Sequence, residues 1–477
     1  MKSTSYTFKN NVHRALNESG LQAALKNARK GFVDKRRIAL DALPEFEDIR
    51  QAAIEIKEHS LANLEAYLTR FEQQVEKNGG QVHWAETPSQ ATKIVTDLCK
   101  SVQARKVTKG KTMVGEEIGV NEAIIAEGMQ PVETDLGEYI IQLAGEPPSH
   151  IIAPAVHKSR RQIADLFHDH HAKLGYTQTL TDPEAIVNEA RSILRNEYVM
   201  ADVGITGANL LIAETGSTVI VTNEGNGDLT ASLPRMHIVI ASIEKVVPTL
   251  EDATTILRLL ARSATGQEIT AYTTFFTGPK RKEDLDGPDQ FHVVLVDNQR
   301  SEMLGNPYRE MLRCIHCGAC LNHCPIYCAV GGHAYGWVYP GPMGAVLTPL
   351  MTGIKQAQHL PQASTFCGRC EEVCPLSIPL PKLLREHRVQ IHEKQVSSSV
   401  SRMALAIWAF TAKHPFLYRL LTIVGVKLLG LLGGKKQRFS SLPFAGAWTR
   451  QRDFPAPQGE IFMNSLQAQR LKGSTDE

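Results

Sequence analysis

Eight of the nine cysteines in this chain of 477 residues lie within residues 314–374. A disulfide scaffold would distribute its cysteines through a small secreted domain. Residues 1–20 contain no apolar segment and no small-residue cleavage site, so they do not predict a secretory signal. Thiols crowded in this way in a long chain are typical of reduced metal ligands in a cytoplasmic protein.

The first cysteine run, residues 314–325, has the spacing C-x2-C-x2-C-x3-C-P. Bacterial ferredoxins with two [4Fe–4S] clusters use this pattern, in which three thiolates of a tight turn ligate one cluster and the fourth cysteine ligates the other. Gly318 lets the backbone wrap closely around a cluster, and Pro325 ends the loop without adding a donor. The run therefore predicts a two-cluster electron carrier.

The second run, residues 367–375, has the last three cysteines of the same pattern, and Ser364 stands where the first would be. The crossed rule assigns four cysteines to one cluster and three to the other, with one iron unassigned. The first cluster has Cys314, Cys317, Cys320 and Cys374, and the second has Cys324, Cys367 and Cys370. Cys328 could supply the eighth ligand, although its spacing from Cys324 does not match the crossed pattern.

Zinc is the alternative occupant, because C-x2-C pairs also bind zinc. The third cysteine at the same spacing and the two Cys-Pro endings favour iron–sulfur clusters. His316 and His323 lie inside the first run and are expected to tune a cluster through charge and hydrogen bonds. Cys99 lies outside both runs and is predicted to be a small buried apolar residue of a helix.

The chain divides into four predicted regions. Residues 1–77 have helical periodicity, residues 78–300 alternate strand-like and helix-like segments, residues 301–385 carry the cysteines, and residues 386–477 begin helical and become apolar and basic. The strand-like segments are 93–96, 218–221, 237–241 and 291–296, and the helix-like ones are 184–195 and 251–263. We therefore expect an α/β domain, an α-helical two-cluster ferredoxin-like domain and a helical C-terminal region.

Residues 331–342, GGHAYGWVYPGP, combine with both cysteine runs in a pattern that closely resembles lactate utilisation protein B, the iron–sulfur subunit of a bacterial L-lactate utilisation system. Four upstream blocks resemble its lactate-utilisation domain, namely 116–122, 133–139, 204–209 and 214–218. The resemblance implies the seven assigned cysteines as cluster ligands. It also implies that the α/β domain shares its fold with formyltetrahydrofolate cyclo-ligase and the CoA-transferases.

The same resemblance implies an oxidoreductase complex of three proteins that oxidises L-lactate to pyruvate and feeds the electrons to the respiratory chain. The residues alone do not separate lactate from another 2-hydroxy acid such as glycolate, and they leave open a non-catalytic redox-sensing or assembly scaffold. Two adjacent clusters favour electron transfer, since a sensor needs only one. The net charge of +2 does not indicate a nucleic acid partner.

Four other segments carry weaker signals. Residues 204–209 and 222–228 are Gly/Asn-rich loops that either bind an anion through backbone N–H groups or form ordinary turns. Residues 168–171, His-Asp-His-His, are expected to form a solvated helix face rather than a metal site. Residues 334–354 are uncharged but contain three prolines, and they are expected to form a loop rather than a membrane span.

Residues 402–452 contain nine basic residues and no acidic one, interleaved with apolar residues. Pro415 and Lys427 are expected to interrupt any membrane span of about 20 residues. Three interpretations stay open, namely an interfacial helix on an anionic membrane, a docking segment for a partner subunit and an ordinary core helix. The first would make this cytoplasmic chain peripheral on the inner face of the cytoplasmic membrane.

Overall fold

The computed structural model describes residues 3–178, 180–433, 437–442, 446–449, 452–458, 461–464 and 466. The chain divides into two compact units, Met1–Val396 and Ser397–Glu477. The predicted cysteine region lies wholly within the first unit, and helix α20 (Leu380–Glu393) runs across the domain boundary expected at residue 385.

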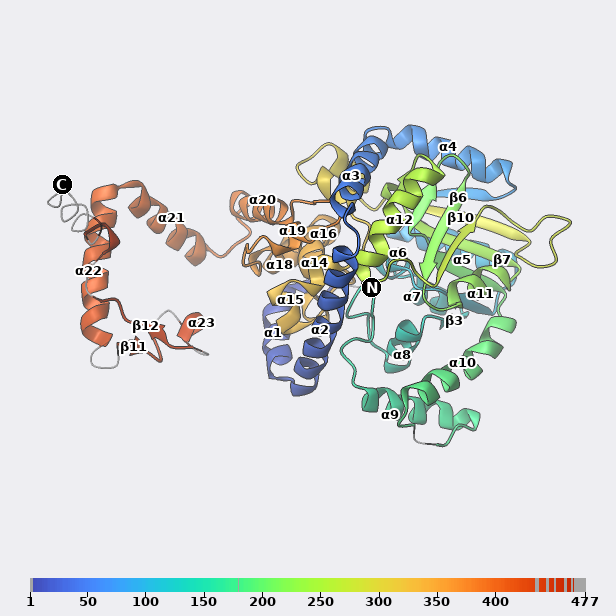
Figure 1. Cartoon of the computed structure of the whole chain (residues 1–477), viewed down its shortest axis with the longest axis horizontal. Coiled ribbons are helices and arrows are strands. Elements are labelled where there is room, and N and C mark those ends of the chain that lie inside the picture. The colour runs from blue at the N-terminus through green and yellow to red at the C-terminus, as the bar shows by residue number, and fades with distance from the viewer. Residues whose placement is uncertain are drawn as a thin grey trace. The chain divides into compact units, whose positions relative to one another are not determined.

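Helices fill the chain before residue 78. They are η1 (Ser5–Thr7), α1 (Phe8–Asn17), α2 (Ser19–Asp41), α3 (Phe46–Ala62) and α4 (Leu64–Lys77). Helices α1 and α2 pack on α15 (Pro325–Val330) of the cysteine region, and α3 packs on α12 (Leu250–Ala264) of the α/β domain (Figure 1). The N-terminal helices therefore contact both of the larger parts of the first unit.

Six parallel strands form the central sheet, in the order β1-β10-β7-β4-β2-β3. Their bounds are β1 (Gln81–Ala85), β2 (Lys106–Lys109), β3 (Gln130–Glu133), β4 (Val203–Gly207), β7 (Met236–Ser242) and β10 (Gln290–Val296). Every residue of β7 is buried, as expected for a parallel strand with both faces covered. The α/β prediction is confirmed.

A smaller sheet has the order β8-β5-β6-β9, with β5 paired parallel to β8 and antiparallel to β6. Its strands are β5 (Leu210–Ile212), β6 (Ser217–Thr222), β8 (Val246–Val247) and β9 (Tyr272–Phe276). Strands β5 and β8 follow closely after β4 and β7 along the chain. The smaller sheet therefore begins where the parallel strands of the large sheet end.

Helices connect the strands of the α/β domain. They are α5 (Pro88–Ser101), α6 (Met113–Ile118), α7 (Val120–Ala126), α8 (Leu136–Ala144), α9 (Arg160–His171), α10 (Pro183–Val199), α11 (Asn226–Ser232) and α12. The prediction of a strand at residues 93–96 was wrong, because these residues lie in α5. A capping box at Thr87 starts that helix, and Ala91, Val95 and Cys99 recur every fourth residue on its buried face.

The interpretation of residues 168–171 as a solvated helix face was wrong for one residue. His171 at the end of α9 is buried, and its imidazole bonds to both the Glu189 carboxylate at 2.7 Å and the Tyr139 hydroxyl at 2.9 Å. Asp169 and His170 are exposed, as expected. The error arose because the partners of His171 are supplied by helices distant in sequence, α8 and α10.

The cysteine region is built from short helices. They are α13 (Arg300–Leu304), η4 (Arg309–Arg313), α14 (Ala319–Asn322), α15, α16 (Gly341–Thr352), α17 (Ile354–Ala357), α18 (His359–Gln362), α19 (Arg369–Glu372) and α20. The prediction of a loop at residues 334–354 was wrong, since most of this segment forms α16. Pro342 lies in the first turn, where a helix tolerates proline, and the helix is buried through Pro349.

The second unit begins with α21 (Ser399–Lys413) and α22 (Pro415–Gly433), followed by the short elements β11 (Arg438–Phe439), α23 (Gly446–Thr449) and β12 (Phe454–Pro455). Pro415 separates α21 from α22 as the first residue of α22, where proline fits, whereas Lys427 lies within α22 without ending it. The expectation that these two residues interrupt any span of about 20 residues was therefore wrong for α22, which has 19 residues. Among the described residues, α22 alone is long and apolar enough to cross a membrane, by length and composition only. Three of the nine basic residues, Lys435, Lys436 and Arg450, lie outside the described residues.

Candidate iron–sulfur site

The first cysteine run folds into a tight loop between η4 and α14. His316 has a φ of 55° and directs its backbone N–H at the Cys314 sulfur, at an N to Sγ distance of 3.4 Å. Gly318 follows with a φ of 74°, a conformation that favours glycine. Helix α14 then begins and carries Cys320. The sequence of conformations turns the three thiols of this loop toward one side.

Four thiols from two distant segments line one cavity. They belong to Cys314, Cys317, Cys320 and Cys374, the set that the crossed rule assigns to the first cluster. The remaining wall is largely apolar and includes Ile151, Met343 and Leu376. An all-sulfur donor set in a dry cavity fits a [4Fe–4S] cluster.

Three thiols line a second cavity, and these belong to Cys324, Cys367 and Cys370. Ser364 lines it too. Cys328 instead lines a small separate cavity with His150 and Tyr327, and its thiol donates to the Asn322 carbonyl at 3.3 Å. The described residues thus divide the seven predicted cysteines into sets of four and three, with Cys328 in neither.

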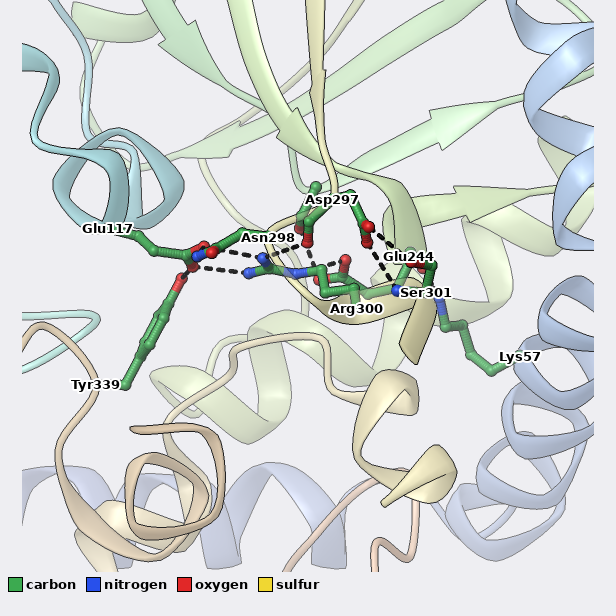
Figure 2. A network of polar contacts seen from close by, with 9 residues as sticks. Lys57, Glu117, Glu244, Asp297, Asn298, Arg300, Ser301 and Tyr339 are labelled. Atoms are coloured by element: carbon green, nitrogen blue, oxygen red, sulfur yellow. Dashed lines mark hydrogen bonds and ion pairs between the residues drawn. The ribbon is translucent and has the colours of Figure 1, made fainter. Parts of the chain in front are cut away.

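A buried polar network joins the α/β domain to the cysteine region (Figure 2). The Arg300 guanidinium makes two contacts with the Glu117 carboxylate, at 2.9 and 2.7 Å, and a third with Glu244 at 3.0 Å. The Tyr339 hydroxyl donates to Glu117 at 2.6 Å. All four residues are at most 4% exposed. Breaking such a network on one side typically costs about 3–5 kcal/mol, because the remaining charge stays buried.

Comparison with known proteins assigns both domains to families. The LUD domain family matches residues 68–296, and the 4Fe-4S dicluster domain family matches residues 310–378. Lactate utilization protein B of Lysinibacillus sphaericus is 42% identical over 478 residues, covering 100% of this chain and 99% of that protein. The protein of the same name from Oceanobacillus iheyensis is 43% identical, covering 98% and 97%. An uncharacterized electron transport protein, YkgF of Escherichia coli, is 40% identical, covering 97% and 96%.

The chain belongs to the lactate utilization protein B family. The resemblance found in the sequence is therefore confirmed over the full length. The match to the dicluster domain also confirms two [4Fe–4S] clusters as the cofactors. The assignment of individual cysteines as ligands stays a prediction, which the two cavities support.

Basic side chains lie close to the first cavity. Lys57 is buried and donates to the Glu244 carbonyl, and burial lowers its pKa to about 8. Lys245 is 8% exposed. Burial alone would raise the pKa of Glu244, but Arg300 and Lys245 lower it to about 2, so this carboxylate is ionised. Thiolate-ligated clusters are anionic, and these cations offset that charge where water cannot. Sequence reasoning missed both lysines because they lie far from the cysteines along the chain. It missed Arg300, which lies shortly before Cys314, because Arg300 belongs to no motif.

His316 connects the first cluster loop to the α/β domain. Its ring is tilted against Tyr339 at a centroid distance of 5.5 Å, and burial together with Lys245 lowers its pKa to about 3. The imidazole is therefore neutral at physiological pH. His323 lies on the other side of the run, where its ring bonds to the Ala319 carbonyl at 2.9 Å. Tuning of the clusters by these two histidines stays a prediction.

A large cleft opens where β2, β4 and β7 end. Its lining includes residues 206–209, 222–224 and 226–227, together with Lys245 and His316. The expectation of loops at 204–209 and 222–228 was wrong in part, because 204–207 belong to strand β4 and Asn226 begins helix α11. Strands β2 and β4 are neighbours in the sheet, but the chain leaves them in opposite directions along it. In open parallel sheets, ligands bind at such a switch point, outside the carboxyl ends of the strands. The cleft therefore lies at the expected place for a ligand and extends to the first cluster loop.

We expect Cys317→Ser and Cys370→Ser each to lose one cluster, because each removes a thiol from a different cavity. Cys99→Ser is the matched control, since Cys99 is buried in α5 away from both cavities. Cys328→Ser should keep both clusters. Iron and sulfide analysis of anaerobically purified chains checks these outcomes. Loss of the second cluster in Cys328→Ser would show that the ligand assignment is wrong.

Proposed function

We propose that this chain is the iron–sulfur electron-transfer subunit of a complex that oxidises L-lactate to pyruvate and passes the electrons towards the respiratory chain. The observation that carries the proposal is the pair of neighbouring thiol-lined cavities, in a chain of the lactate utilization protein B family. L-lactate releases two electrons and two protons as it becomes pyruvate. Two one-electron centres in one chain match that demand.

The thiols of the two cavities differ in their exposure to solvent. Cys317, Cys320 and Cys374 are buried, and apolar walls exclude water from the first cavity. Cys367, which lines the second cavity, is exposed. When bound, the clusters supply one-electron oxidation and reduction. The exposed edge at Cys367 is therefore the side from which electrons pass to or from a partner subunit.

Two alternatives concern the substrate and the role. The substrate could be another 2-hydroxy acid such as glycolate, which differs from lactate only by a methyl group. A pocket discriminates one methyl group by about 1–3 kcal/mol, so a preference between the two acids is measurable. A redox-sensing or assembly scaffold would hold the same clusters but would not turn over with either acid.

Electron transfer from L-lactate to an artificial acceptor should occur when the chain is purified anaerobically with its co-purifying partners. We expect a higher rate with L-lactate than with glycolate, and loss of activity in Cys370→Ser because the relay is broken. Cys99→Ser should retain activity. A complex with both clusters intact that is inactive with both acids would favour the scaffold and contradict the proposal.

We also propose that the cleft at the ends of β2, β4 and β7 binds a small carboxylate. Lys245 lines the cleft and is nearly buried, and its ammonium makes no hydrogen bond to another residue in the described part of the chain. Ala208, Asn209 and Asn223 line the same cleft. A carboxylate there would complete the hydrogen bonding of Lys245 and lie beside the loop that carries Cys314.

Isothermal titration of the full chain with L-lactate and with pyruvate tests this site. Lys245→Met removes the charge at similar length, and we expect affinity to fall at least tenfold, since a hydrogen bond to a charged group contributes about 1.5–3 kcal/mol. Lys245→Arg should bind more tightly than Lys245→Met. The exposed Lys282→Met is the control. Equal affinity in Lys245→Met and the unchanged chain, or no binding at all, would contradict the proposal.

We further propose that α21 and α22 attach the chain peripherally to the inner face of the cytoplasmic membrane. Within these two helices, which are described throughout, Gly433 alone is buried, while Trp408, Phe416 and Leu431 are at least 65% exposed. The charges of residues 402–452 are all basic, which suits an anionic membrane better than an internal core. Docking onto another subunit of the complex is the competing role for this surface.

Flotation with anionic and neutral vesicles tests the membrane proposal. A chain truncated after Gln395 removes both helices, and Arg419→Glu with Lys427→Glu reverses charge at constant length. We expect the full chain to float with anionic vesicles at low salt and less at high salt, since each basic residue near the surface contributes about 1 kcal/mol and salt screens it. Equal recovery of full and truncated chains would exclude these helices as an anchor and favour a partner subunit.

The α/β domain is further proposed to share the architecture of formyltetrahydrofolate cyclo-ligase and the CoA-transferases. The parallel six-stranded sheet with a smaller sheet at its carboxyl edge supports this relation. An experimental structure of residues 68–296 superposed on members of those families tests it, and a different strand order would contradict it.

A further inference from the structure

The two cluster loops have the same backbone conformation, although their sequences differ at one ligand position. In the first loop, His316 has a φ of 55° and donates its backbone N–H to the Cys314 sulfur. In the second, Phe366 has a φ of 54° and donates its backbone N–H to the Ser364 hydroxyl oxygen at 3.2 Å. Ser364 thus stands in the second loop where the ligand Cys314 stands in the first.

The correspondence continues along both loops. Gly318 and Gly368 have φ values of 74° and 79°, and each is directly followed by a four-residue helix, α14 or α19. The second residue of each helix is a cysteine, and a Cys-Pro pair follows each helix. Phe366 adopts a left-handed conformation, which is unfavourable for a residue other than glycine. This conformation directs its N–H at the Ser364 hydroxyl, and a second loop without a ligand at position 364 would not need it.

Arg388 of α20 holds the start of the second loop in place. Its guanidinium donates to the Ser364 carbonyl at 2.8 Å and to the Pro361 and Gln362 carbonyls at 3.1 Å. It also lies over the Phe366 ring, 4.1 Å from the centroid. The backbone on both sides of the Ser364 hydroxyl is therefore fixed, as a pre-formed ligand position requires.

We propose that the Ser364 Oγ is the eighth cluster ligand and binds the fourth iron of the second cluster. Ser364 lines the same cavity as Cys324, Cys367 and Cys370. Cys328, the other candidate, lines a separate cavity. On binding, the serine hydroxyl would lose its proton to solvent hydroxide, giving water and an alkoxide Oγ that would hold the iron. The step is redox-neutral. It rests on the two-cluster function proposed above.

An oxygen ligand makes one iron of the second cluster different from the other seven. Soft thiolates suit iron–sulfur clusters better than a hard alkoxide does. The iron bound by Ser364 is therefore the one that leaves first on mild oxidation, giving a three-iron cluster. Ser364 lines the same cavity as the exposed Cys367, so this cavity is open to solvent on the side of the second loop.

Three variants of the full chain, purified anaerobically, test the assignment. Ser364→Cys should keep about eight irons and resist conversion to the three-iron form, because a thiolate replaces the alkoxide. Ser364→Ala should contain about seven irons and show a three-iron EPR signal as purified. Thr365→Ala is the control, since Thr365 is the neighbour of Ser364 and lines the same cavity.

Mössbauer spectra of the same samples provide a readout that does not depend on activity. The unchanged chain should show one iron site distinct from the rest, and Ser364→Cys should remove that distinction. An unaltered iron content and spectrum in Ser364→Ala would overturn the proposal, and loss of one iron in Cys328→Ala would then assign that thiol instead. Absence of iron from the unchanged chain would refute the two-cluster function itself, which is a different result.

Discussion

The crossed sharing of cysteines between two loops is the constraint on which the rest of the structure depends. Cys320 and Cys324 are close in sequence but line different cavities, and Cys374 returns from the second loop to complete the first cavity. Neither set of predicted ligands is complete within one loop. The two loops must therefore be brought together before either predicted ligand set is complete. Helix α16 lies between the two loops in sequence and is largely buried, so it is part of the core that packs around them.

Placing anionic clusters in an apolar interior requires compensating charge, and cations from outside the two cysteine runs supply it. Lys57 and Lys245 lie on the side of the first cavity, and Arg300 is fixed between Glu117 and Glu244. Charge–charge interactions are strong where water is excluded. The network in Figure 2 also includes Tyr339 of the cysteine region, so it joins the two domains beside the lysines of the first cavity.

The correct predictions came from residue spacing over short stretches of the sequence. The cysteine pattern is a property of one short turn, and the β-branched runs at 237–241 and 291–296 are central strands of a buried parallel sheet. The errors involve partners distant along the chain. Residues 93–96 have strand-like composition but are held in α5 by its cap and its buried face, and His171 is buried by helices on either side of it in sequence. Arg300 carries no local signal, since its role is defined only by Glu117 and Glu244.

The central claim is that one chain holds two clusters close together. EPR of the anaerobically purified, dithionite-reduced chain tests this claim most directly. Neighbouring reduced clusters interact magnetically, so we predict a broadened, spin-coupled spectrum from a chain containing about eight irons and eight acid-labile sulfides. A single uncoupled cluster signal, or stoichiometric zinc without broad visible absorbance, would contradict the account.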